Sequence, residues 1–197
     1  MGRKIITFLQ ISVDGFIEGP NGEMDWMMTE DEDAWEYLFE MLSHVDTHIL
    51  GRKAYPGYEQ YWLAVLSDPG EILPISGRVA SKNEITYARI ADSRRHIVLS
   101  NTLDKVAWKT TQIVRDVEDI RKMKQQPGED MYAVGGATLV SSLINLGLID
   151  ELRLLVTPII LGGGMALFKD VKERHTLKLA ETKPLKSGMV GLVYLIE

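Results

Sequence analysis

Short apolar runs rich in β-branched residues alternate with segments of helical period along most of this chain, and this alternation constrains the fold more than any other feature of the sequence. The runs predict strands at residues 4–13, 47–50, 95–101, 110–114, 131–136 and 151–161. The helical spacing of apolar residues predicts helices at about 30–44, after Asp116, and from 137 to a stop at Gly147. Strands that alternate with helices are typical of an α/β fold with a mostly parallel central sheet.

The ends of several predicted elements are marked by local signals. Thr29 and Glu32 have capping-box spacing, so the first helix is expected to begin there. The segment around Pro56-Gly57 is expected to interrupt a short helix. Residues 65–92 show no clear hydrophobic pattern, so no helix or strand is assigned to them. The tail predicts two strands around the Lys186-Ser187-Gly188 turn, which would form an antiparallel C-terminal hairpin at one edge of the sheet.

The composition narrows the possible partners. The chain is 45% hydrophobic and 25% charged, and no linker or repeat divides it, so we expect a single domain over residues 1–197. A net charge of -6 argues against a nucleic-acid partner, because phosphate contacts need a basic face. With no cysteine, disulfides and thiolate chemistry are excluded. No run approaches the roughly 20 apolar residues of a membrane span, and the N-terminus is unlike a signal peptide, so we expect a cytoplasmic protein with no membrane partner.

Three predicted strands end in residues that suit an anion. They end at Gly51-Arg52, Ser100-Asn101 and Gly135-Gly136, the last of these running directly into a helix. If the strands are parallel neighbours, these ends meet at the sheet edge where open α/β folds bind ligands. A helix start offers backbone N–H groups, and arginine offers a guanidinium. Taken singly, each pair is more often a turn or a surface cation, and neither the dinucleotide fingerprint nor the P-loop is present.

Acidic residues form a second set of candidates. Asp14-Gly15 follows the first strand and could place a carboxylate at the same edge, or could simply be a turn. Glu32 or Asp33 could face a cleft, although acidic residues in a first helical turn also stabilise the helix dipole. No metal site is expected, since His44 and His48 straddle a helix end and a strand start.

Several segments together resemble a known family. The order "ISVDGFI", "ILGRKAY", "IVLSNTL", "YAVGGATLV" and "GLIDELRLLVTPIILGGGMALF" resembles the dihydrofolate reductase-like superfamily, and within it the reductase domain of the bifunctional riboflavin-biosynthesis deaminase/reductase. The resemblance spans essentially the whole chain. It implies a three-layer fold, in which helices flank a central sheet of about eight strands and NADPH lies across the strand ends.

The resemblance also implies roles for individual residues. Those at the cofactor would be Gly51 and Arg52 at the adenosine 2'-phosphate, Leu99, Ser100 and Asn101 beside the adenosine, and Gly135, Gly136, Ala137 and Thr138 at the pyrophosphate. Those near the nicotinamide and substrate would be Asp14 with Gly15, the glycine turn of Gly162, Gly163 and Gly164, and Glu32 or Asp33. Asp14 or a bound water would assist proton delivery.

Function follows as an expectation from this resemblance. We expect an NADPH-dependent reductase that acts on a small pyrimidine or pterin-like substrate, most simply a ribosylamino-pyrimidine phosphate, and that forms a homodimer. Two alternatives stay open, which are dihydrofolate reduction and a nucleotide-binding homologue without turnover. Ala54 stands where dihydrofolate reductases carry a hydroxyl residue, which would remove one phosphate hydrogen bond worth roughly 0.5 to 1.5 kcal/mol.

Overall fold

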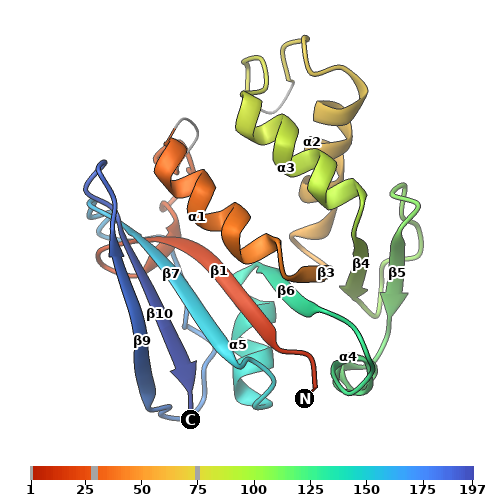
Figure 1. The fold of residues 1–197 in the computed structure, drawn as a ribbon, viewed down its shortest axis with the longest axis vertical. Coiled ribbons are helices and arrows are strands. Elements are labelled where there is room, and N and C mark those ends of the chain that lie inside the picture. Colours follow the sequence, from red (N-terminus) through yellow and green to blue (C-terminus); the bar gives the residue numbers. More distant parts are fainter. Residues whose placement is uncertain (1, 28–30, 74–75) are drawn as a thin grey trace.

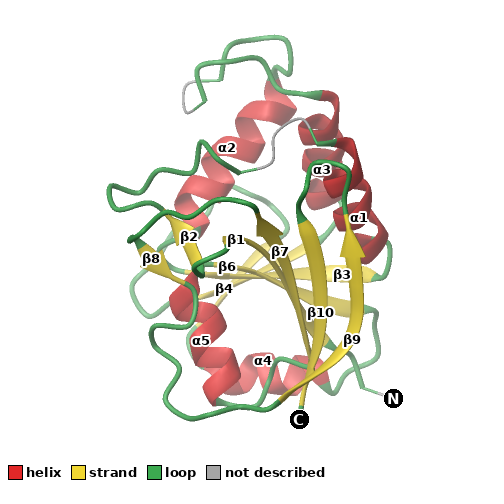
Figure 2. Ribbon diagram, turned by 90° about the vertical axis from the view of Figure 1, so that its left-hand side faces the viewer, coloured by secondary structure: helices red, strands yellow, loops and turns green. Residues whose placement is uncertain are grey.

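The protein is built in three layers around one large sheet (Figure 1). The structure is a computed structural model that describes residues 2–27, 31–73 and 76–197. Figure 2 shows α1, α2 and α3 on one side of the sheet and α4 and α5 on the other. The fold class predicted from the sequence is therefore confirmed, as an α/β fold with a mostly parallel sheet and antiparallel strands at its C-terminal end.

The large sheet has eight strands in the order β5-β4-β3-β6-β1-β7-β10-β9. They are β1 (Ile5–Ser12), β3 (Val45–Gly51), β4 (Arg95–Leu99), β5 (Thr111–Val114), β6 (Asp130–Gly135), β7 (Glu151–Thr157), β9 (Leu177–Pro184) and β10 (Val190–Ile196). The pairs from β5 to β7 are parallel, and β10 is antiparallel to both β7 and β9. The predicted hairpin is thus the edge of the sheet.

In the described part of the chain, five helices cover the two faces. They are α1 (Glu32–Leu42), α2 (Tyr55–Ser67), α3 (Lys82–Asp92), α4 (Val117–Lys124) and α5 (Ala137–Asn145). The predicted start of the first helix at Thr29 lies outside the described residues, and within them Asp31 is the N-cap and accepts a hydrogen bond from the amide of Ala34. The expected interruption at Pro56 was wrong, because this proline lies in the first turn of α2, where the helix needs no proline N–H.

Burial on both faces explains why the central strands are almost continuously apolar. On β1, Ile5 and Ile11 pack into the core beneath α4 and α5, whereas Ile6 and Phe8 pack against α1 on the other face. Successive side chains of a strand point to opposite faces, so a strand covered on both sides is mostly apolar, and the buried polar side chains of β1 are Thr7, Gln10 and Ser12. This places β1 at the centre of the molecule.

Two features near the end of β7 differ from the prediction. β7 ends at Thr157 and does not continue past Pro158, since a proline N cannot donate to the ladder. A small second sheet, formed by β2 (Phe16–Glu18) and β8 (Met165–Ala166), was not predicted. Its strands are too short to leave a periodic pattern, yet they bring the segment after β7 beside the segment after β1.

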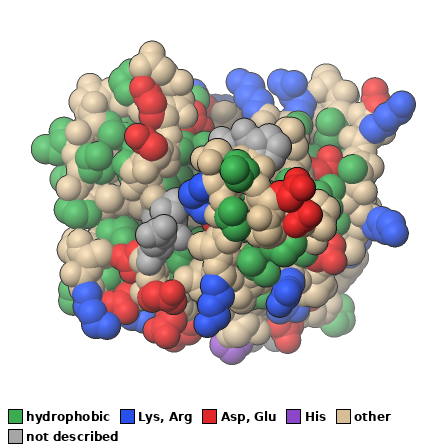
Figure 3. All heavy atoms as spheres, turned by 90° about the horizontal axis from the view of Figure 1, so that it is seen from above, with side chains coloured by type: hydrophobic (Ala, Val, Ile, Leu, Met, Phe, Trp, Pro, Cys, Tyr) green, Lys and Arg blue, Asp and Glu red, His purple; other side chains and the backbone are tan. Residues whose placement is uncertain are grey.

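The surface carries charges of both signs. Figure 3 shows acidic and basic side chains interspersed over one face. No helix among the described residues is both long and apolar enough to cross a membrane.

Candidate functional site

The carboxyl ends of β4, β3 and β6 lie side by side, and a cavity opens above them. β3 pairs in parallel with β4 on one side and with β6 on the other, so the three strand ends meet as the sequence predicted. The cavity has a volume of about 440 Å³. A smaller neighbour of about 210 Å³ shares Arg52 and Leu99 with it and is also lined by Ser100, Asn101 and Thr102. The lining of the larger cavity consists of Ile17, Glu18, Gly51, Arg52, Lys53, Ala54, Leu99, Gly136, Ala137, Thr138, Leu139, Ser142, Met165 and Lys169.

The glycines at the end of β6 bring the start of α5 to this cavity. Gly136 is the N-cap of α5 and has no side chain to cap the helix. The amide of Leu139 donates to the carbonyl of Gly136 at 3.0 Å, so the amides of Ala137 and Thr138 are the ones left for an external acceptor. A helix N-terminus also carries a partial positive charge that favours anions. Gly51 permits the close approach of β3, since a Cβ there would lie 3.2 Å from Cβ of Leu139. The peptide bond between Gly135 and Gly136 is cis.

Three cations border the cavity without a counter-charge. Arg52, Lys53 and Lys169 form no ion pair with any described residue, and Glu18 is the one carboxylate among the described residues of the cavity lining. Unpaired cations around a concave surface attract an anionic ligand. Sequence reasoning identified Arg52 but missed the two lysines. Lys53 is adjacent to Arg52 and could have been found, whereas Lys169 arrives from a distant loop through the β2–β8 pairing.

Ser100 has a structural role at the end of β4. Its side chain is buried, and its Oγ accepts hydrogen bonds from the amides of Thr102 at 3.2 Å and Leu103 at 2.8 Å. The carbonyl oxygen of Ser100 accepts a further hydrogen bond from Arg115 at 2.7 Å. Ser100 therefore holds the turn that shapes the smaller cavity, and the exposed Asn101 next to it is the side chain available to a ligand.

Asp14 ties the end of β1 to the glycine turn. Its two carboxylate oxygens accept hydrogen bonds from the amides of Leu161 at 3.1 Å and Gly162 at 2.8 Å. A hydrogen bond from the Ser12 side chain, together with these amides, lowers the pKa of Asp14 from its usual value. An acid that is already ionised can orient a water molecule, but it has no proton of its own to give at neutral pH. The geometry thus favours a positioning function for this residue.

The glycine turn lies beside the cavity without lining it. Gly162 and Gly164 have φ values of 73° and 124°, and a Cβ on Gly164 would lie 2.0 Å from the carbonyl oxygen of Glu18. Only glycine therefore fits where this turn crosses β2. Gly163 packs near Pro20, and the turn reaches the cavity through Met165 and Glu18.

The acidic start of α1 lies away from the cavity. Asp33 forms an ion pair with Lys186 of the β9–β10 turn at 3.2 Å, and Glu32 is exposed. Neither belongs to the cavity lining. Their contribution in this structure is a favourable interaction with the N-terminus of α1.

A hydroxyl on α5 that is not among the predicted site residues also faces the cavity. Ser142 of α5 lines it and donates a hydrogen bond to the carbonyl of Thr138 at 2.7 Å. Ser141 beside it is buried and contacts the carbonyl of Leu167 at 3.3 Å. Helical spacing could have shown that Ser142, and not Ser141, faces the cavity, because residues four apart, such as Thr138 and Ser142, share a helix face.

The histidines form no metal site. His44 is exposed after α1, whereas His48 is buried in β3, where its Nδ1 lies 3.1 Å from the hydroxyl of Tyr58. No group of three or more His, Asp or Glu side chains that could hold a metal ion occurs within residues 2–27, 31–73 and 76–197.

Comparison with known proteins agrees with this architecture. Residues 3–191 match the RibD C-terminal domain family. The chain is 36% identical over 192 residues to "Uncharacterized protein YyaP" of Bacillus subtilis (strain 168), and the match covers 98% of this chain and 94% of that protein.

Solved structures of low sequence identity share the fold. A "Putative riboflavin biosynthesis protein" from Shewanella sp. PV-4 matches with a TM-score of 0.70 and 20% identity, over 100% of this chain and 99% of that one. Dihydrofolate reductase from Enterococcus faecalis, complexed with NADP(H) and RAB-propyl, matches with a TM-score of 0.64 and 16% identity, over 98% and 96% of the two chains. A diaminohydroxyphosphoribosylaminopyrimidine deaminase/5-amino-6-(5-phosphoribosylamino)uracil reductase from Thermotoga maritima matches with a TM-score of 0.64 and 15% identity, over 100% of this chain and 57% of that one. The chain therefore belongs to the RibD C-terminal (reductase) domain family and has the dihydrofolate reductase-like fold.

Proposed function

We propose that this protein is an NADPH-dependent reductase that binds its cofactor across the carboxyl ends of β4, β3 and β6. The observation that carries the proposal is the coincidence, at one cavity, of an uncapped helix N-terminus with Arg52, Lys53 and Lys169, none of which has an ion-pair partner among the described residues. A dinucleotide with a pyrophosphate and a 2'-phosphate supplies the negative charge that such a site lacks.

The residues at the cavity suit the parts of NADPH. The first turn of α5, from Gly136 to Thr138, would hold the pyrophosphate through backbone amides, and Arg52 would contact the 2'-phosphate. Ile17 and Met165 would form the apolar end of the cavity, where the nicotinamide ring belongs. Ala54 also lines the cavity. Because it has no hydroxyl, the site offers the cofactor one hydrogen bond fewer but loses no charge.

NADPH, when bound, supplies a hydride. The protein would hold the ring, exclude water and present an electron-poor carbon of the substrate. This carbon takes up the hydride, and the heteroatom doubly bonded to it takes up one proton. Asp14 is ionised and anchored to two amides, so we assign it to orienting a water molecule that delivers this proton. The chain would therefore contribute to catalysis mainly by positioning the cofactor, the substrate and the water molecule.

The substrate we propose is a ribosylamino-pyrimidine phosphate or a close pyrimidine relative. The name of the Thermotoga maritima reductase, which has the same fold, supports this choice. Dihydrofolate is a weaker candidate, because neither Glu32 nor Asp33 lines the cavity and Asp33 is paired with Lys186.

The test has two stages. NADPH is first titrated against the protein by fluorescence, and we expect binding well below about 1 mM, the concentration that corresponds to roughly -4.1 kcal/mol. Loss of NADPH absorbance is then followed with 5-amino-6-(5-phosphoribosylamino)uracil and, separately, with dihydrofolate. No binding below about 1 mM refutes the proposal as a whole. Binding without oxidation by either compound refutes the assigned substrate and favours a nucleotide-binding homologue without turnover.

We also propose that the protein forms a homodimer through the edge of its sheet. β9 is the last strand of the sheet, and Leu177 and Leu179 on it are 37% and 52% exposed. An edge strand with exposed leucines can pair with a second copy. Light scattering should therefore give about twice the monomer mass of 22.2 kDa, and a mass near 22.2 kDa refutes the dimer.

A further inference from the structure

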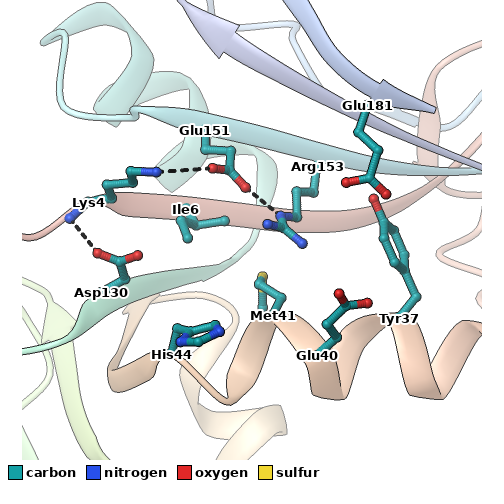
Figure 4. Close-up of a pocket in the computed structure, with 10 residues that line it drawn as sticks. All are labelled: Lys4, Ile6, Tyr37, Glu40, Met41, His44, Asp130, Glu151, Arg153 and Glu181. Carbon is teal, nitrogen blue, oxygen red and sulfur yellow. Dashed lines mark hydrogen bonds and ion pairs between the residues drawn. The ribbon is translucent and has the colours of Figure 1, made fainter. Parts of the chain in front are cut away.

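A second cavity lies at the opposite edge of the sheet from the proposed cofactor site (Figure 4). Its volume is about 360 Å³, and it opens between α1 and the amino ends of β1, β6 and β7, with β9 at one side. It shares no lining residue with the cavities at the carboxyl ends of β3, β4 and β6. The residues that line it are Lys4, Ile6, Tyr37, Glu40, Met41, His44, Asp130, Glu151, Arg153 and Glu181.

Arg153 supplies the strongest anion-binding group of this groove. Its side chain is only 19% exposed, and its Nε donates to Oε1 of Glu151 at 2.5 Å. Its two terminal nitrogens have no hydrogen-bond partner among the described residues. A guanidinium held from one side, with two parallel donors left over, matches the geometry of a carboxylate.

Two carboxylates stand at the Tyr37 end of the same groove. Glu40 projects from α1 and Glu181 from β9, and Figure 4 shows both near the ring of Tyr37. Glu40 is 3.6 Å from the ammonium of Lys183, whereas Glu181 has no ion-pair partner among the described residues. The same ammonium of Lys183 also lies 4.9 Å from the centre of the Tyr37 ring. This end of the groove therefore already attracts ammonium groups.

Tyr37 contributes a buried polar atom without a partner. The residue is 1% exposed, and its hydroxyl has no hydrogen-bond partner within residues 2–27, 31–73 and 76–197. Burial raises the pKa of Tyr37 to about 12, with smaller effects from Arg153, Glu181, Glu151 and Glu40, so the hydroxyl stays neutral at physiological pH. A neutral hydroxyl between charges of both signs can donate to a carboxylate and accept from an ammonium. Buried polar groups in proteins almost always have a hydrogen-bond partner, so a ligand is expected to supply one here.

We propose that this groove binds a small zwitterion, an α-amino acid with an aliphatic side chain. Its carboxylate would pair with the terminal nitrogens of Arg153, and its ammonium group would lie between Glu40 and Glu181. The side chain would extend from Arg153 over Ile6 and Met41, the apolar residues of the lining.

The balance of charge excludes simpler ligands. The lining holds two cations, Lys4 and Arg153, and four carboxylates, those of Glu40, Asp130, Glu151 and Glu181. A simple anion would face those carboxylates, and a simple organic cation would face the guanidinium in the middle of the groove. No group of three metal-ligating side chains was found in the described part of the chain, which argues against a metal ion. A ligand that carries both charges close together pairs with the guanidinium and with the two carboxylates at the Tyr37 end.

Three probes of similar shape separate these possibilities. L-norleucine carries both charged groups, pentylamine lacks the carboxylate, and hexanoate lacks the ammonium. Each is titrated into the uniformly 15N-labelled protein, and backbone amide shifts are followed by NMR. We expect norleucine to shift amides of α1, β7 and β9 and to bind at least about tenfold more tightly than either analogue, since each lacks one charge-assisted contact.

Variants then localise the binding. Glu181→Gln, an exposed change, should weaken norleucine about tenfold or more, and Arg153→Lys, which keeps a cation beside Glu151, should do the same. Glu36→Gln is the matched control, because Glu36 is exposed on α1 and lies outside the groove lining. The proposal is overturned if norleucine causes no shifts at about 20 mM, if either analogue binds as tightly, or if Glu181→Gln binds like Glu36→Gln.

Discussion

Acid should destabilise this protein through two buried histidines. His48 of β3 and His96 of β4 are fully buried side by side, with ring centres 5.3 Å apart. Burial lowers the pKa of both groups, that of His96 to about 4 and that of His48 well below its usual value. Asp92 and Glu59 act in the opposite sense on His96 but do not offset burial. Both rings are therefore neutral in the folded protein at pH values where the unfolded chain binds protons.

The magnitude follows from this difference in proton binding. Since the folded pKa values are depressed, the stabilisation is present above the unfolded pKa of about 6.5 and is lost as the pH falls toward about 4. When the pH falls from about 7 to about 5, each histidine lowers the free energy of unfolding by roughly 2 kcal/mol, or about 4 kcal/mol for the pair. Small domains have only about 5–15 kcal/mol of unfolding free energy, so the loss is a large share of the total.

Urea unfolding at the two pH values, followed by tryptophan fluorescence, measures this loss. In His96→Gln, whatever its absolute stability, the difference between the two pH values should fall to roughly 2 kcal/mol, because one titrating group is gone. His44→Gln is the control, since His44 is exposed, and the full difference should persist. Equal unfolding free energies at both pH values in the unchanged protein, or an undiminished difference in His96→Gln, would refute the reasoning.

Four further changes test other parts of the structure. Arg52→Ala should weaken NADPH about tenfold and NADH much less, as it removes a charge-assisted contact to the 2'-phosphate; equal losses in a fluorescence titration would contradict this assignment. Gly191→Ala should lower the unfolding free energy by about 1–3 kcal/mol, since its Cβ would lie 2.8 Å from Cε1 of Tyr37. Gly57→Ala, inside α2 with no atom within 4 Å of the new Cβ, should instead raise it by about 0.5–1 kcal/mol. Asp14→Asn should speed hydrogen exchange at the amides after β7 that its carboxylate now holds, and unchanged exchange there would remove its assigned positioning function.

The sequence predicted the parts of the fold that depend on local pattern. Apolar β-branched runs gave the central strands, because a strand buried on both faces has no freedom to alternate. The meeting of Gly51, Ser100 and Gly135 at one edge followed from the parallel pairing of their strands, which the structure confirms. Gly147 was predicted as the stop of the helix that became α5, and it has a φ of 62°.

The parts that could not be predicted depend on contacts between distant segments. Lys169 reaches the cavity at the carboxyl ends of β3, β4 and β6 only because β8 pairs with β2, and these two strands are too short to show a period. The hydrogen bond from the amide of Gly162 to the carboxylate of Asp14 joins positions 148 residues apart, and no local pattern reveals it. The groove that contains Arg153 is assembled from α1 and four strands, so its residues never appear near one another in the sequence.

The central place of β1 has a consequence for how the chain is made. β1 pairs with β6 and β7, so its partners are Met131 and Glu151 at the nearest, far along the chain. At roughly 5–20 residues per second of synthesis, the ribosome needs on the order of 10 s to add them after β1 has emerged. During that interval one of the most apolar strands has no permanent neighbour. A nascent chain of this topology must therefore keep its first strand shielded, and the cavity beside α5 forms only after the second half of the chain has been made.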